Sequence, residues 1–104
     1  MPKSRKEQIE EMLADDPNDT FLRYGLAMEH VSAGDDAAAL HCLQELLQVA
    51  PDYVPAYVQA GQLCARAGRD NEAKALFRTG IDVARRNGDQ HAAGEMEGFL
   101  IALD

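Results

Sequence analysis

The stretch AYVQAGQLCARAGRDNEAKALF, residues Ala56–Phe77, repeats the pattern of a stretch that lies 34 positions earlier in the chain. The same spacing separates pairs of residues that are small, apolar or helix-ending: Pro17 and Pro51, Ala27 and Gly61, Gly34 and Gly68, Ala39 and Ala73, and Leu43 and Phe77. A period of this length is typical of stacked supersecondary units rather than of one irregular globule. The repeat therefore predicts the architecture of the chain.

Length and charge narrow the classes of protein that the chain can form. Its 104 residues leave room for one domain, which three such periods nearly fill. The net charge is −8, and the only basic cluster is Lys3–Lys6. A chain with this balance repels phosphate backbones and anionic lipid heads. We therefore expect neither a nucleic acid partner nor a membrane partner.

The two cysteines indicate a reducing compartment. Cys42 and Cys64 lie inside apolar helical patterns and lack the CxxC or histidine spacing of a metal or redox site. We expect them to be reduced core residues, which fits a cytoplasmic protein. The N-terminal residues have the positive charge of a secretion signal but not its apolar core, and the longest apolar run is Phe99–Leu103. No targeting or membrane-spanning segment is predicted.

Caps and turn residues divide the chain into six predicted helices. Ser4 and Glu7 form a capping-box pattern, and Gly34, Gly68 and Gly88 supply left-handed turns. The helices are predicted at about residues 4–16, 18–33, 36–50, 54–67, 71–86 and 89–103. Because the loops are short, each helix is expected to lie antiparallel to its predecessor. Gly94 and Gly98 lie one turn apart on the last helix, where we expect them to allow close packing against the preceding one.

In this pattern the chain resembles the tetratricopeptide repeat proteins, whose unit is a 34-residue helix-turn-helix with a sparse pattern of large and small residues. The family's motif positions fall in this sequence on Leu26, Ala27, Ala39, Leu43 and Pro51, and on Tyr57, Ala60, Gly61, Cys64, Ala73 and Phe77. Departures are Arg23 and His30, where the family prefers aromatic residues, and Arg85, where it prefers a closing proline. The missing proline predicts that the last repeat helix runs longer.

The resemblance implies an all-α fold of antiparallel helical hairpins, stacked as a short right-handed α-solenoid of about six helices. We expect a single domain over residues 1–104. It divides into an N-terminal half-repeat helix at 4–16, repeats at 18–51 and 52–85, and a C-terminal capping helix at 89–103.

No catalytic or metal-binding constellation can be assembled from the sequence. His30, His41 and His91 are scattered over three predicted helices. His91 and Glu95 lie one turn apart, but two ligands do not make a zinc site. We expect a protein that is not an enzyme and that holds no metal or cofactor.

The first helix of each pair carries a second apolar stripe, which begins with Phe21, Tyr24 and Met28. In the proteins that the chain resembles, these positions line a concave groove where peptides bind. The predicted partner-binding groove comprises Phe21, Tyr24, Met28, Val31, Val58, Gln59, Gln62, Ala65, Arg66, Ala92 and Met96. A groove of this kind suits an amphipathic helix or an apolar peptide of a partner protein.

The groove also indicates which partners to expect. Family members that bind chaperone tails clamp a carboxylate with basic and amide side chains, but here those places hold Tyr24, Met28, Gln59, Asp89 and Ala93. A partner with an apolar or basic surface therefore fits the acidic chain better. The leading hypothesis is a non-enzymatic protein–protein interaction module with a preformed groove.

The competing hypothesis is self-assembly. The run Phe99–Leu103 places apolar residues on every side of a helix, although the end of a repeat array usually turns a polar face to water. A homodimer that buries the groove and the C-terminal helix would cover them. A following repeat of a longer array, or a last helix that folds back, would cover them as well. The candidate surface of the homodimer comprises Phe99, Leu100, Ile101 and Leu103.

Overall fold

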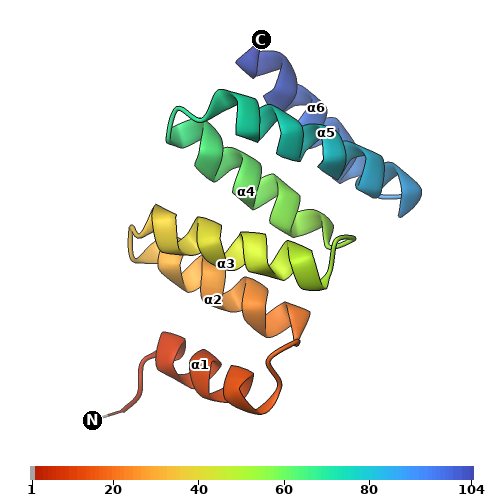
Figure 1. Ribbon diagram of the computed structural model, residues 1–104. Coiled ribbons are helices and arrows are strands. Elements are labelled where there is room, and N and C mark those ends of the chain that lie inside the picture. The colour runs from red at the N-terminus through yellow and green to blue at the C-terminus, as the bar shows by residue number, and fades with distance from the viewer. Residues whose placement is uncertain (1) are drawn as a thin grey trace. The chain divides into compact units, whose positions relative to one another are not determined.

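The computed structural model describes residues 2–104, which form six helices (Figure 1). These are α1 (Arg5–Asp15), α2 (Thr20–Ser32), α3 (Asp36–Val49), α4 (Val54–Arg66), α5 (Asp70–Arg86) and α6 (Gln90–Leu103). No strand occurs in this part of the chain. The all-α prediction is confirmed, as is the greater length of the last repeat helix, α5, at 17 residues.

Two compact units make up the chain. The first unit ends at Pro51 and holds α1, α2 and α3, and the second unit, Asp52–Asp104, holds α4, α5 and α6. In the first unit α2 packs against both α1 and α3, and in the second α5 packs against both α4 and α6. The single-domain organisation expected from the sequence stays a prediction.

Polar side chains start four of the helices. At α1 the Ser4 hydroxyl accepts a hydrogen bond from the Glu7 N–H at 3.1 Å, and the Glu7 carboxylate accepts one from the Ser4 N–H at 3.5 Å. This is the predicted capping box. Three aspartates each accept a bond from the N–H three positions on: Asp19 from Leu22 at 2.9 Å, Asp35 from Ala38 at 3.1 Å and Asp89 from Ala92 at 3.0 Å.

Three helices end in the same left-handed turn. Gly34, Gly68 and Gly88 have φ values of 79°, 74° and 74°, a region that residues with a Cβ rarely adopt. The residue after each glycine donates its N–H to a carbonyl five positions back, as in the Asp35 to His30 bond of 2.9 Å. This is the Schellman arrangement, which satisfies carbonyls at the helix end. The three predicted turns are therefore confirmed.

The core of the second unit depends on close contacts at two glycines. A Cβ on Gly61 of α4 would overlap the ring of Phe77 of α5, which is fully buried. A Cβ on Gly80 of α5 would lie 2.7 Å from the Tyr57 Cβ and 2.6 Å from the Met96 Sδ. The absence of a side chain at these positions lets α4, α5 and α6 approach closely.

Small and branched residues fill the core of the first unit. Ala27 of α2 and Ala39, Leu43 and Leu46 of α3 are fully buried, and Ile9 of α1 covers α2 near Gly25. Among residues 2–104, no buried side chain is polar or charged. The core of the first unit is therefore held together by apolar packing.

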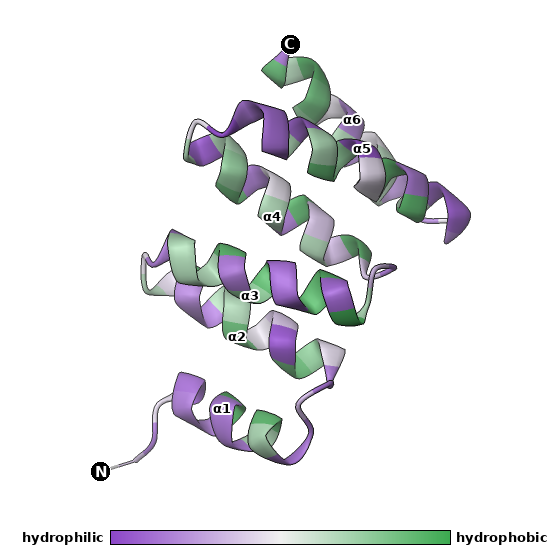
Figure 2. Ribbon diagram, viewed as in Figure 1, coloured by the Kyte–Doolittle hydropathy of each residue, from purple (hydrophilic) through white to green (hydrophobic). Residues whose placement is uncertain are grey.

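The ends of α5 are polar. Asp70 and Glu72 lie in its first turn and Arg85 and Arg86 in its last, and Figure 2 shows hydrophilic residues at both ends of this helix. Each charge has the sign that the helix dipole favours at that end.

None of the helices described is long and apolar enough to cross a bilayer.

The prediction that Gly94 and Gly98 pack against the preceding helix is wrong. Both are exposed, and a Cβ on either would meet nothing within 4 Å. The residues of α6 that are buried are Ala93 and Met96, which lie on a different side of the helix. Small residues at helical spacing here face water.

Replacing Gly61 by alanine should therefore destabilise the protein by about 1–3 kcal/mol, because the added methyl group would displace the Phe77 ring. Urea unfolding followed by circular dichroism measures the change. The matched control is Gly94→Ala, which meets open space inside α6 and should stabilise the protein by about 0.5–1 kcal/mol. Equal stability of Gly61→Ala and wild type would contradict the close contact.

Candidate functional site

An apolar groove runs between α1 and α2 in the first unit, and we call it the α1–α2 groove. It has a volume of ≈ 590 Å³. One wall comes from Gln8, Ile9 and Met12 of α1, and the other from Phe21, Tyr24 and Met28 of α2. Within each helix, the three residues are at helical spacing and so lie on one face.

The lip of this groove exposes two large apolar side chains. Phe21 is 77% exposed and Met12 is 49% exposed. At the other end of the groove, Arg5 Nε lies 3.8 Å from Glu29 Oε2. The groove therefore has one end bordered by an ion pair and one end bordered by apolar side chains.

A second groove lies within the second unit, between α4 and α6, and we call it the α4–α6 groove. It has a volume of ≈ 320 Å³. Gln62, Ala65 and Arg66 line it from α4, Phe99, Ala102 and Leu103 line it from α6, and Phe77 of α5 contributes from the core. The rings of Phe77 and Phe99 lie with centroids 5.5 Å apart. This groove thus has an aromatic base, and its rim carries the amide of Gln62 and the guanidinium of Arg66.

Ten of the eleven predicted groove residues fall into three sets. Phe21, Tyr24 and Met28 meet in the α1–α2 groove, and Gln62, Ala65 and Arg66 meet in the α4–α6 groove. The half-buried residues that belong to neither set of lining residues are Val31, Val58, Gln59 and Ala92.

Met96 requires a correction. It is 0% exposed and packs against Gly80, so it belongs to the core and not to a groove. The absence of a side chain at Gly80 leaves the space that Met96 fills. Helical spacing alone could not show this, because it places Met96 on the same stripe as Ala92 and Phe99.

Sequence reasoning missed the wall that α1 supplies. Ile9 and Met12 stand three residues apart, which marks one face of a helix, and Gln8 borders it. That spacing was the available signal. It indicated a packed face, but not that part of the face stays open beside α2.

The residues proposed for a dimer surface are unequally exposed. Ile101 is 75% exposed, whereas Phe99, Leu100 and Leu103 are half-buried. Phe99 and Leu103 also line the α4–α6 groove. Ile101 is the member of this set that lies on an open surface.

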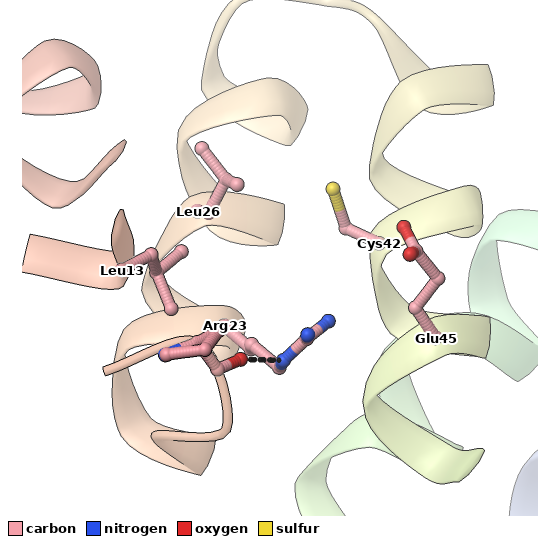
Figure 3. Close-up of a pocket in the computed structure, with 6 residues that line it drawn as sticks. Leu13, Arg23, Leu26, Cys42 and Glu45 are labelled. Atoms are coloured by element: carbon pink, nitrogen blue, oxygen red, sulfur yellow. Dashed lines mark hydrogen bonds between the residues drawn. The ribbon is translucent and has the colours of Figure 1, made fainter. Parts of the chain in front are cut away.

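A smaller cavity of ≈ 120 Å³ holds the more accessible thiol (Figure 3). Leu13, Arg23, Leu26, Cys42 and Glu45 surround it, and Arg23 Nε donates a hydrogen bond to the Pro17 carbonyl at 2.6 Å. Burial, and secondly the charge of Glu45, raise the pKa of the Cys42 thiol. The thiol therefore stays protonated near neutral pH, and a protonated thiol is a poor nucleophile.

Metal ligands do not converge in the described chain. Residues 2–104 contain no group of three or more histidine, cysteine, aspartate or glutamate side chains that could hold a metal ion. His41 Nε2 lies 3.2 Å from Glu45 Oε1 on the exposed side of α3. The recognisable binding features are the two apolar grooves.

Antiparallel helical hairpins that repeat at a fixed period define the class of helical-repeat proteins. The family model for the tetratricopeptide repeat matches residues 30–94. A TPR repeat-containing protein of Pseudomonas aeruginosa is 33% identical over 98 residues, which cover 94% of this chain and 93% of that protein. The chain belongs to the tetratricopeptide repeat family.

Solved structures agree with this assignment. A tetratricopeptide repeat domain protein from Salinibacter ruber is 35% identical, with a TM-score of 0.80 over 85% of this chain and 89% of that chain. A protein from Bordetella parapertussis is 27% identical, with a TM-score of 0.83 over 98% of this chain and 89% of that chain. The predicted helical-repeat fold is confirmed. Domains of this family mediate protein–protein interactions.

Both thiols should react slowly at neutral pH. Burial is the main cause that raises the pKa of Cys64 as well as that of Cys42, so alkylation of either should accelerate only at a higher pH than for free cysteine. Cys64 is also 0% exposed, and should react at least about tenfold more slowly than Cys42 because it waits for local opening. Iodoacetamide labelling read by peptide mass spectrometry measures both rates. Labelling of Cys64 at the rate of free cysteine at neutral pH would contradict its buried position.

Proposed function

We propose that this chain is a non-enzymatic protein–protein interaction module whose apolar grooves accept a peptide or helix of a partner protein. The observation that supports this most is the exposure of Phe21 at the lip of the α1–α2 groove, beside the half-exposed Met12. Contiguous exposed apolar side chains are uncommon on soluble monomers and mark interaction surfaces. A partner that covers them would remove that surface from water.

The form of the α1–α2 groove suits this task. Its volume falls within the range of about 300–1,000 Å³ that ligand sites occupy. Helices supply both walls, so little conformational entropy is lost from the backbone on binding. Met12 and Met28 are flexible and polarisable, which lets the groove adapt to side chains of different shape.

The α4–α6 groove adds polar specificity to the proposal. Gln62 and Arg66 lie at a rim whose remaining lining is apolar. Their amide and guanidinium groups can hydrogen-bond to the backbone of an extended peptide. The net charge of −8 favours a partner with an apolar or basic surface. Val31, Val58, Gln59 and Ala92 remain predicted contact positions outside the two grooves.

Self-assembly is the second candidate, and one observation favours it. Ile101 is a large apolar side chain that is 75% exposed at the end of α6. A homodimer formed there would cover Ile101 and, beside it, the half-buried Leu100, Phe99 and Leu103.

Phe21→Ser should weaken capture of the partner by roughly tenfold or more, since exposed aromatic anchors commonly contribute most of the binding energy of an interface. The measurement is a quantitative pull-down from a lysate of the source organism with wild type and variant. Because Phe21 is exposed, the variant should keep its helicity and unfolding midpoint. Ile101→Ser, which removes an equally exposed apolar side chain from the second unit, is the matched control and should leave capture by the α1–α2 groove unchanged. Identical recovery with wild type and Phe21→Ser would rule out that groove.

The assembly candidate predicts a molecular mass that depends on concentration. Sedimentation across dilution should show a dimer that dissociates, and Ile101→Ser should shift dissociation to higher concentration by about tenfold. A strict monomer at micromolar concentration would exclude this candidate.

A further inference from the structure

We infer that the α1–α2 groove accepts a segment whose apolar anchor is flanked on one side by lysine or arginine, with these basic residues at the Phe21 end of the groove. The inference rests on the proposed interaction function. It adds the chemistry of the partner and the end of the groove at which its basic residues lie.

The acidic charge of the chain is concentrated in the first unit. Residues 1–51 contain ten aspartates and glutamates against four lysines and arginines, whereas residues 52–104 contain eight against six. Six of the eight net negative charges therefore belong to the unit that contains the α1–α2 groove. A cationic segment is attracted to this unit before contact, and an anionic one is repelled.

Within the first unit, the acidic residues cluster at one end of the groove. The short connection between α1 and α2 places the C-terminal end of α1 beside the N-terminal end of α2, so Met12 and Phe21 share that end. The connection and its flanks contribute Asp15, Asp16 and Asp19. Asp15 and Asp16 are exposed. Asp19 caps α2 through its carboxylate.

Arg23, the cation nearest to this end in sequence, offsets only part of the charge of these three carboxylates. Its Nε donates a hydrogen bond at 2.6 Å to the carbonyl of Pro17, which belongs to the connection, and Arg23 extends from α2 toward Cys42 and Glu45 of α3 (Figure 3). It lines the smaller cavity and not the α1–α2 groove.

The opposite end of the groove is electrically mixed. Arg5 lies there with Glu29 at 3.8 Å. Lys3 pairs instead with Glu11, the residue before Met12 in α1. Arg5 and Lys3 are thus each paired with a carboxylate. The groove has an acidic end and a mixed end, which favours one orientation of a segment that is basic on one side of its apolar anchor.

The test uses three synthetic amphipathic helical probes of about 15 residues, a length at which isolated helices become viable. All three share one apolar face. The first carries lysines after the apolar anchor, the second carries glutamates there, and the third carries the lysines before the anchor. Fluorescence anisotropy gives the Kd of each for the full chain at ionic strengths of about 0.01 M and 1 M, where the Debye length is about 30 Å and 3 Å.

We expect one lysine probe to bind roughly tenfold or more tightly than the glutamate probe at low salt, since each exposed charge pair changes affinity by about two- to fivefold. The two lysine probes should differ by at least about threefold, and all differences should shrink at high salt. The double substitution Asp15→Asn with Asp16→Asn should remove most of the lysine preference. The matched control, Asp36→Asn with Glu45→Gln, removes the same charge from α3 outside the groove and should retain it.

Three outcomes would overturn the inference. Equal affinity for lysine and glutamate probes, with both weakened by Phe21→Ser, rejects the charge assignment but keeps the proposed interaction function. An equal loss of preference in the two double variants shows that only net charge matters, and rejects the location of the basic residues. Absence of Phe21-dependent binding by any probe at about 1 mM, the weak limit of useful affinity, contradicts both the inference and the proposed function.

Discussion

The close approach of α4 and α5 at Gly61 is the contact on which the second unit depends. With no side chain at Gly61, the Phe77 ring lies directly against the backbone of α4. The Phe77 ring also lies beside Phe99 of α6, with centroids 5.5 Å apart, and both rings line the α4–α6 groove. One missing methyl group thus sets the separation of two helices and, through Phe77, the base of a proposed binding surface. Because Phe77 is both a core residue and the base of the α4–α6 groove, a change in the packing of the core also changes the shape of this groove.

Local bonds explain why the helices and turns were predictable from sequence. A capping aspartate or a left-handed glycine acts through neighbours within five residues, so Asp19, Asp35, Gly34 and Gly68 specify their helix ends directly. Binding positions depend on distant neighbours. Three residues of α2 and three of α4 were assigned to surfaces that the structure shows as grooves, but Met96 fills the space beside Gly80 and is buried. Helical spacing defines a face of a helix and leaves open what lies against it.

The two units use similar helical hairpins to present different surfaces. The α1–α2 groove has the larger volume, carries an exposed aromatic lip and lies in the more acidic unit. The α4–α6 groove has an aromatic base and a rim with a glutamine and an arginine. The family's motif residues, such as Ala39, Ala73 and Phe77, are fully buried in each hairpin. Residues that hold the fold and residues that border the grooves are therefore mostly different, and binding preference can change at Phe21 or Gln62 while the hairpins persist.

The acidity of the chain also has two distinct physical origins. One group consists of the capping residues Asp19, Asp35 and Asp89. Their carboxylates accept hydrogen bonds from backbone N–H groups in the first turns of α2, α3 and α6, so these negative charges also stabilise the start of each helix. Asp15 and Asp16 are exposed beside a groove. Protein engineering that neutralises acidic residues, for example to change solubility or column behaviour, would have to treat these two groups differently. The capping aspartates tolerate serine or asparagine, which preserve the cap without the charge, whereas the exposed pair has no helix start to protect.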